Sequence, residues 1–405
     1  WGVAEGISPL DDDQVSHRHH SYKFEYTRVP FGEKDCYSWR LKRVSLVNSK
    51  GVISNYTPDH HAFFYPIQEF EYTDGYVTDI INRDTYKRIV MRYSVKDDYG
   101  HNVACLIDME GKEKRQGSAY LDASTTSMTP NINSNSTKSK IKRFHYTRNE
   151  RGYIMKITYH ANDGDDIEET AIGDNNNIFG KLFDLDSLGR VIKVSYINNE
   201  NNLMTDKFGV GHIRYTYSKY SGTEATEFLG EDLQLTNNEE KYAKVNSKFD
   251  KYGNIIEESY YGLDNMPCYN NENVHRLIIS YDNSGNMSEI RLYDLNGSLS
   301  YCKDSYAILK SSYDSKGRCV EFAFYDINEK ACYSKDNYSI ARIKYNSTDC
   351  AIEQSVFDTN GLPCVEKYYG VHKICRNYNE YNYLLEESLY DEFDELNVSP
   401  MYHFA

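Results

Sequence analysis

A unit of about 32 residues repeats along the second half of this 405-residue chain. Four copies run consecutively from Phe249 to Asn377, and their opening aromatic residues lie 32 positions apart. These openings are Phe249, Tyr281, Tyr313 and Tyr345. A further copy opens at Tyr378, and earlier copies open at Tyr217 and Leu185. A fixed period of this size is typical of repeat proteins, in which each unit packs mainly against its neighbours.

Each unit begins with a turn signal. The copy that opens at Tyr281 continues with Asp282 and reaches Gly285 three residues later. Asp accepts hydrogen bonds from turn amides, and Gly adopts the left-handed conformation that closes a short hairpin. Asp349 and Asn382 replace this glycine in the last two copies. Because both residue types tolerate positive φ, the replacements support the predicted turn.

The residues after the turn alternate with period two. Ile290 and Leu292 fall on one face of a predicted strand and Glu289 on the other, while Leu277 and Ile279 alternate in the same way in another strand. Two strands per unit over about seven or eight units predict some fourteen to sixteen antiparallel strands in a meander. The predicted fold is therefore all-β, an elongated array of repeats. Strand twist should make it a coiled or wrapped antiparallel sheet, with propeller-like closure as another arrangement.

The chain divides into three predicted regions. Residues 1–122 have strand-like patches without a clear period, which favours a β-rich N-terminal cap or divergent repeats. Residues 123–140 are dominated by Ser, Thr and Asn, and so predict a flexible linker or loop. Residues 141–405 form the predicted β-repeat array.

Composition excludes several classes of function. A formal net charge of −15 disfavours binding to nucleic acid or to anionic membranes. No apolar run is long enough to insert into a membrane as a helix. Phosphate-binding, serine-hydrolase and cysteine–histidine signatures are absent, so we expect neither enzymatic activity nor a cofactor. The alternative of an enzyme survives only for residues 1–122, where a divergent site would lack these motifs.

The nine cysteines do not follow a disulfide pattern. Cys268, Cys332 and Cys364 occupy the same position of three units, where a small apolar side chain would pack. This placement favours a reducing compartment such as the cytoplasm, with the cell surface as the alternative location.

A glutamate recurs at the ninth position of five units. These residues are Glu257, Glu289, Glu321, Glu353 and Glu386, here called the glutamate ladder. Equivalent residues of successive units should lie about 10 Å apart because another strand separates them, too far for catalysis by paired carboxylates. The ladder is either a solvated face that keeps the sheet from aggregating or a negatively charged groove for a basic protein partner.

Aromatic residues recur at the first and thirteenth positions, the latter including Tyr293 and Tyr325. Core and cross-strand packing explains such rows, but exposed tyrosines also bind proteins and glycans through flat amphipathic surfaces. We predict that the glutamate ladder, Tyr293 and Tyr325 contact a partner. A protein is the expected partner, and a glycan is the alternative.

Two clusters of metal-ligand residue types lack the spacing of a metal site. His17, His19 and His20 match no zinc pattern, so we interpret them as exposed histidines near the terminus. The acidic cluster from Asp163 to Glu168 fails the calcium-loop pattern and is better explained by turn residues. No metal site is predicted.

The unit openings YDNSGN and YDSKGR resemble the YD repeats of the Rhs family over residues 141–405. Repeats of that family form long β-sheet wraps that sometimes enclose a toxin. The resemblance implies a β-repeat scaffold. We therefore expect a non-catalytic bacterial scaffold that binds a protein partner, such as the recognition part of a larger polypeptide. The alternative is a cell-surface module that binds glycan through exposed tyrosines.

Overall fold

The computed structural model describes most of the chain as regular β-structure. It describes residues 9–30, 37–54, 66–73, 76–98, 101–107, 143–151, 153–161, 170–174, 176–218, 222–367 and 369–397. The predicted linker 123–140 and the acidic cluster from Asp163 to Glu168 lie outside these residues. The strands on either side of the predicted linker, β6 and β7, pair with each other, so the sheet is continuous there.

The described strands form one 23-stranded antiparallel sheet, which confirms the predicted all-β class. The single helix, α1 (Asp12–His17), is too short to cross a membrane, and the described residues contain no helix that could. The strands are β1 (Ser21–Pro30), β2 (Tyr37–Val47), β3 (Ile67–Thr73), β4 (Tyr76–Arg83), β5 (Ile89–Asp98), β6 (His101–Ile107), β7 (Arg143–Arg148), β8 (Ile154–Ala161), β9 (Thr170–Ala171), β10 (Gly180–Leu185), β11 (Val191–Ile197), β12 (His212–Tyr217), β13 (Thr223–Leu229), β14 (Lys244–Phe249), β15 (Ile255–Tyr261), β16 (Arg276–Tyr281), β17 (Met287–Tyr293), β18 (Ile308–Tyr313), β19 (Cys319–Tyr325), β20 (Ile340–Tyr345), β21 (Ala351–Phe357), β22 (Lys373–Tyr378) and β23 (Leu384–Tyr390).

The first turn of each unit has the predicted geometry. Asp282 Oδ1 accepts hydrogen bonds from the amides of Ser284 and Asn286, at 2.8 and 2.9 Å. Gly285 has a φ of +74°, and the residues that replace this glycine in later units also have positive φ. Asp349 has a φ of +69° and Asn382 one of +63°. The prediction that these residues share the left-handed conformation is confirmed.

The second loop of each unit contains two turns, of which the sequence pattern predicted one. In the unit from Tyr281 the first of these turns begins at Asp294. The second is closed by a hydrogen bond of 2.9 Å, which the Cys302 amide donates to the Tyr306 carbonyl. The second turn folds back over one face of the sheet. There Tyr306 stacks on Phe324 with ring centroids 4.7 Å apart, and Cys302 is buried against Leu292. This loop therefore covers apolar side chains of its own unit and of the next one.

The tyrosine that opens a unit ties that unit to the preceding one. The hydroxyl of Tyr313 donates to the Met287 carbonyl at 2.7 Å, and that of Tyr281 donates to the Ile255 carbonyl at 2.7 Å. Burial raises the pKa of Tyr313, so its hydroxyl stays protonated and can donate. This row of aromatic residues is structural, as the packing interpretation predicted.

Replacing Tyr313 with phenylalanine should therefore lower the free energy of unfolding by about 1 kcal/mol, because the Met287 carbonyl loses its donor. The urea midpoint measures this change. Tyr325→Phe is the matched control, since the structure shows no hydrogen bond from the Tyr325 hydroxyl to a described residue. Equal losses in the two variants would mean that this hydrogen bond contributes nothing.

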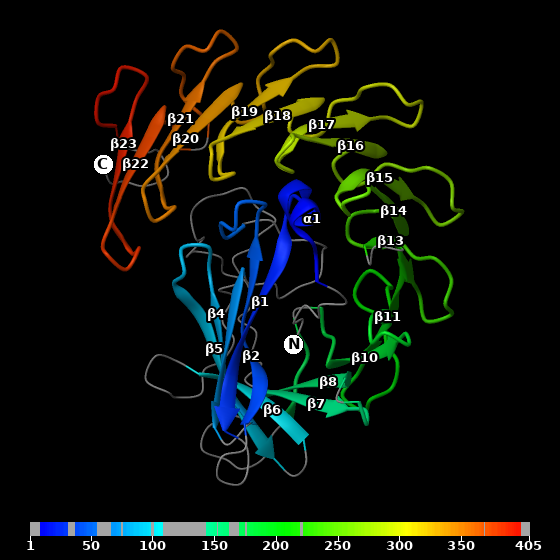
Figure 1. Cartoon of the computed structure of the whole chain (residues 1–405). Helices are drawn as coiled ribbons and strands as arrows, with labels where there is room; N and C mark the ends of the chain where they lie inside the picture. The colour runs from blue at the N-terminus through cyan, green and yellow to red at the C-terminus, as the bar shows by residue number, and fades with distance from the viewer. Residues whose placement is uncertain are drawn as a thin grey trace.

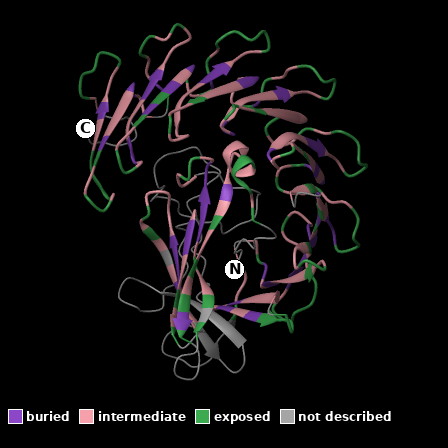
Figure 2. Cartoon of the chain, in the orientation of Figure 1, coloured by how far each residue is buried: buried purple, intermediate pink, exposed green. Residues whose placement is uncertain are grey.

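The sheet curls so that its later strands arch over the N-terminal ones. Figure 1 shows β14 to β23 arching above α1 and the early strands, with the first turns of the units on the side of α1 and the longer loops pointing away. Figure 2 shows that these longer loops are largely exposed, whereas the strands are buried or half-buried. The sheet is wrapped, and β1 and β23 are its two ends.

The segment that follows α1 docks on the first turns of the array. The ring of His17 stacks on that of Tyr252, with centroids 4.6 Å apart and planes 7° apart. Asn254 donates from Nδ2 to the His17 carbonyl at 2.9 Å and accepts from the His19 amide at 2.8 Å. These contacts join residues more than 230 positions apart in sequence.

Two more N-terminal turns make similar contacts farther along the array. Asn48 Nδ2 donates to the carbonyls of Lys316 and Gly317, at 2.9 and 3.1 Å. Asn382 Nδ2 donates to the Tyr86 carbonyl at 3.2 Å. The N-terminal turns thus follow the row of first turns in order, which fixes the curvature of the sheet.

The interpretation of His17, His19 and His20 as exposed residues near the terminus is wrong. All three are half-buried, and the rings of His17 and His19 lie against Tyr252 and Tyr281 of the array. A strand pattern could not reveal this, because the groups that cover them come from distant units such as those containing Tyr252 and Tyr281.

Candidate interaction surfaces

The glutamate ladder lies on one face of the sheet, where most of its members form ion pairs. Four of the five glutamates are half-buried, and each lies beside a Lys or Arg of its own strand or of a neighbouring strand. The pairs are Glu257 with Lys248 at 2.8 Å, Glu289 with Arg291 and Lys310, Glu321 with Arg342 at 2.7 Å, and Glu353 with Lys344 at 2.7 Å. Glu386 is exposed and accepts a hydrogen bond from Asn377 Nδ2 at 3.1 Å. The solvated-face interpretation of the ladder stays a prediction.

These pairs change what the ladder can offer to a partner. A carboxylate beside its own cation contributes little net field, so a basic protein would have to compete with Lys or Arg for it. The binding role of Glu257, Glu289, Glu321, Glu353 and Glu386 stays a prediction.

Tyr293 and Tyr325 lie half-buried on the same face as the ladder. The guanidinium of Arg276 lies 4.9 Å from the ring centroid of Tyr293, and the ammonium of Lys310 lies 4.9 Å from that of Tyr325. One face of each ring thus already holds a cation. Their predicted contact with a partner also stays a prediction.

A second set of apolar side chains is exposed on the loops between strands. Leu263, Leu295 and Ile327 occupy one position of three consecutive units, and Tyr269, Tyr301 and Tyr333 occupy another; we call these six residues the outer rim. Their exposed fractions lie between 40% and 57%. Equivalent members should lie about 10 Å apart, since each unit adds two strands. The outer rim thus repeats an exposed apolar residue and an exposed tyrosine in three consecutive units.

The outer rim was not predicted from the sequence. Its members recur every 32 residues, but they lie in loops, where the alternation used to sort strand residues does not apply. A search for large apolar residues that recur outside the alternating segments would have found them.

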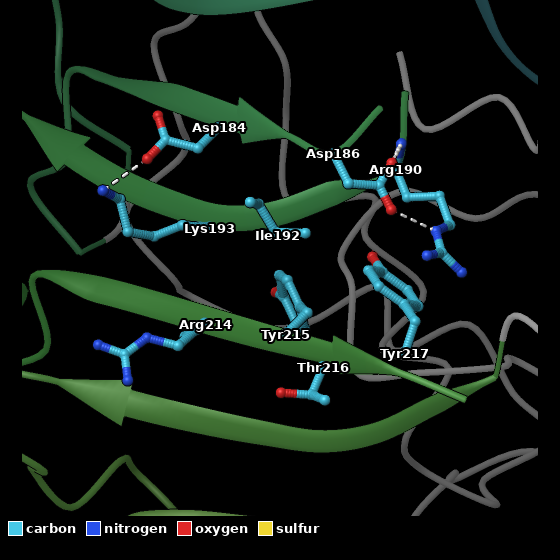
Figure 3. A pocket seen from close by; sticks show the side chains of 9 residues that line it. All are labelled: Asp184, Asp186, Arg190, Ile192, Lys193, Arg214, Tyr215, Thr216 and Tyr217. Atoms are coloured by element: carbon cyan, nitrogen blue, oxygen red, sulfur yellow. Dashed lines mark hydrogen bonds and ion pairs between the residues drawn. The ribbon is translucent and has the colours of Figure 1, made fainter. Parts of the chain in front are cut away.

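A shallow hollow of about 420 Å³ lies on β10, β11 and β12. Figure 3 shows its lining residues, Asp184, Asp186, Arg190, Ile192, Lys193, Arg214, Tyr215, Thr216 and Tyr217. Both carboxylates are paired, Asp184 with Lys193 at 2.6 Å and Asp186 with Arg190 at 2.7 Å. The guanidinium of Arg190 also lies 4.6 Å from the Tyr217 ring centroid. The charged groups of this hollow thus join neighbouring strands.

The described residues contain no group of three His, Cys, Asp or Glu side chains that could hold a metal ion. The cysteines whose side chains are described are free thiols. Burial raises the pKa of Cys268, and that of Cys332 and Cys364 to about 11. At neutral pH these thiols are protonated and weakly reactive.

No protein-family model matches the chain, and no curated protein matches it in sequence. Among solved structures, it is similar to the crystal structure of TcdB2-TccC3, at 10% identity and a TM-score of 0.27 over 86% of this chain. It is also similar to a Photorhabdus luminescens Tc holotoxin pore, at 9% identity and a TM-score of 0.29 over 86% of this chain. The similar regions cover 19% and 21% of those longer chains.

Proposed function

We propose that this chain is a non-catalytic repeat scaffold that holds a protein partner on its outer rim. The observation that supports this is the rim itself, in which large apolar side chains stay exposed at equivalent places of three consecutive units. Exposed apolar side chains that gather on one part of a surface are typical of interaction sites. Tyrosine adds a large contact area at a low cost in side-chain entropy.

The loops that carry the rim are rigid enough to present it. In the loop that holds Leu295, Asp294 Oδ1 accepts bonds from the amides of Asn296 and Ser298, both at 2.9 Å. The loop that holds Ile327 has the same bonds to Asp326, at 2.8 and 2.9 Å. A partner would therefore meet a preorganised surface and would order little backbone on binding.

Substituting aspartate for both Leu295 and Ile327 should abolish partner binding without unfolding the protein. Both side chains are already exposed, so the free energy of unfolding should change by less than about 0.5 kcal/mol. The measurement is affinity capture from a lysate of the source cell, with wild-type and substituted chains as parallel baits and far-UV circular dichroism as the test of folding.

Leu203→Asp is the matched control. Leu203 is 48% exposed, close to the 43% of Leu295, but it lies in an earlier loop outside the rim. A partner that is captured by the wild type and by the Leu203 variant, but lost from the double variant, supports the proposal. Capture of the same partner by all three baits contradicts it.

Glycan binding is the second candidate, favoured by the exposed row of Tyr269, Tyr301 and Tyr333. Sugar rings bind to flat aromatic surfaces of this kind. In that case Tyr301→Ala with Tyr333→Ala should remove retention on immobilised polysaccharide, while the aspartate substitutions at Leu295 and Ile327 should have a smaller effect. Failure of the wild type to bind any polysaccharide would remove this candidate.

A further inference from the structure

Backbone hydrogen bonds join the loops of neighbouring units next to the tyrosines of the outer rim. In each bond the amide of one unit donates to a carbonyl of the preceding unit. The bonds run from Lys303 to Glu272 at 3.2 Å, from Lys335 to Asp304 at 2.8 Å, and from Lys367 to Asp336 at 2.9 Å. Tyr301 and Tyr333 each lie two residues before a donor. The bonds therefore hold the tyrosine row near the spacing of the sheet, which is about 9.6 Å for two strands.

This spacing favours one conformation for a bound polypeptide. A polyproline II helix has three residues per turn and rises about 3.1 Å per residue, so it presents the same face about every 9.3 Å. A β-strand does so about every 6.8 Å, and an α-helix about every 10.5 Å. Over the two intervals from Tyr269 to Tyr333, the polyproline helix departs from the row by less than about 1 Å and the α-helix by about 2 Å. Every third residue of a polyproline helix thus meets a tyrosine.

The loops of the rim also carry a row of carboxylates. One lies next to the exposed Leu or Ile of each loop, at Asp264, Asp294 and Asp326. Among the described residues none of these three forms an ion pair, since Arg291 pairs instead with Glu329 at 2.8 Å and Lys335 with Asp304. Basic residues of a ligand would approach this row without displacing a cation of the protein.

We propose that the outer rim binds a proline-rich segment of another polypeptide, with a proline at every third position and basic residues between the prolines. The prolines would pack on Tyr269, Tyr301 and Tyr333. Aromatic surfaces recognise such segments because the polyproline helix is already formed before binding. The chain has eight prolines, and no two of them are three positions apart, so neither its other segments nor a second copy supplies this ligand. The inference rests on the proposed rim function and specifies the partner.

The probe is a labelled peptide, APRAPKAPRA, whose three prolines are spaced by three. It should bind the full chain saturably and at one to one, as measured by fluorescence anisotropy. The control peptide APRPKPAARA has the same composition, but its prolines are spaced by two and so point to different sides of the helix. It should bind about tenfold more weakly or less well still. Equal binding of the two peptides would overturn the proposal, and so would absence of binding by the first.

Tyr301→Ala locates the site on the protein. This residue is the centre of the tyrosine row, so its loss should weaken binding of APRAPKAPRA by about tenfold. Tyr383→Ala is the matched control, because Tyr383 is 47% exposed, close to the 43% of Tyr301, and lies in a later unit outside the rim. It should leave the affinity unchanged. Equal affinities of these two variants would overturn the assignment to the rim.

Asp294→Asn combined with Asp326→Asn tests the role of charge without disturbing the loops. Asn198 has the same position in the unit from Leu185, and its Oδ1 accepts the same two amide bonds, from Glu200 and Asn202, both at 2.9 Å. The double variant should therefore keep both turns, bind APRAPKAPRA about fivefold more weakly, and show a smaller dependence on salt. An unchanged affinity would overturn the basic character of the ligand.

The inference and the proposed rim function can fail separately. A partner captured from lysate through Leu295 and Ile327, together with no binding of APRAPKAPRA, would overturn the proline-rich ligand and leave the rim function in place. If the aspartate substitutions do not affect capture and Tyr301→Ala does not affect peptide binding, both proposals are overturned.

Discussion

Replacing Gly285 with alanine should lower the free energy of unfolding by about 3 kcal/mol, whereas the same change at Gly361 should cost about 1 kcal/mol. Both glycines have positive φ, +74° and +79°. Either alanine would therefore be strained in the left-handed conformation. The two sites differ in what a Cβ atom would meet.

A Cβ atom on Gly285 would lie 2.6 Å from the carbonyl carbon and oxygen of His17, and 2.8 Å from the carbonyl carbon of Arg18. These are backbone atoms, so relief of the clash requires the N-terminal segment to move. Its hydrogen bonds with Asn254 would then be lost, at about 1 kcal/mol each. At Gly361 a Cβ atom would meet nothing within 4 Å, so that variant measures backbone strain alone.

Chemical denaturation gives the two stability losses, and amide hydrogen exchange shows where the loss occurs. In the Gly285 variant the amide of His19 should exchange much faster than in the wild type, because its acceptor is Asn254. In the Gly361 variant that amide should remain protected. Equal stability losses with His19 protected in both would mean that the docked segment does not depend on this close approach.

The parts of the fold that local patterns determine were predicted from the sequence. The period of 32, the two strands per unit and the left-handed residues at Asp349 and Asn382 all depend on residues within one unit. The extra turn of each unit was not predicted, and in the unit from Tyr281 its first residue, Cys302, carries no turn signal. Equivalent turns in other units begin with Asp206, Asn238 and Asn270, which do carry the signal.

Contacts between distant units could not be predicted in this way. No pattern links His17 to Tyr252 or Asn48 to Lys316, since each pair comes together only when the sheet curls. The glutamate ladder illustrates an intermediate case. The position of its glutamates on one face follows from alternation. The Lys and Arg residues that pair with them occupy different positions from unit to unit, so these ion pairs were not predicted.

Acidification should release the docked N-terminal segment. Burial, together with the neighbouring charges of His19 and Arg18, lowers the pKa of His20 to about 3. Burial also lowers the pKa of His19, although the carbonyl of Gly285 and the carboxylate of Asp282 oppose that shift. Both imidazoles are therefore neutral in the docked state at pH 7.

The direction of the pH effect follows from these shifts. An unfolded histidine binds a proton near pH 6.5, whereas docked His20 resists it until about pH 3. The unfolded or undocked state therefore binds more protons, so the stability of docking is complete above pH 6.5 and falls as the pH decreases toward 3. One pKa unit corresponds to about 1.4 kcal/mol, which gives a loss of up to about 2 kcal/mol at pH 5 from His20.

Hydrogen exchange of the His19 amide between pH 7 and pH 4, corrected for intrinsic rates, measures this loss. His20→Gln should flatten the dependence, because glutamine does not titrate. The other charged groups that act on this segment include Asp282, which acts on His19, and Asp250, which acts on Arg18; their contribution is what remains in this variant. In the Gly285→Ala variant the exchange of the His19 amide should be almost independent of pH, because the N-terminal segment is already displaced at pH 7. If the exchange of the His19 amide depends on pH as steeply in the His20→Gln variant as in the wild type, other groups control docking in acid.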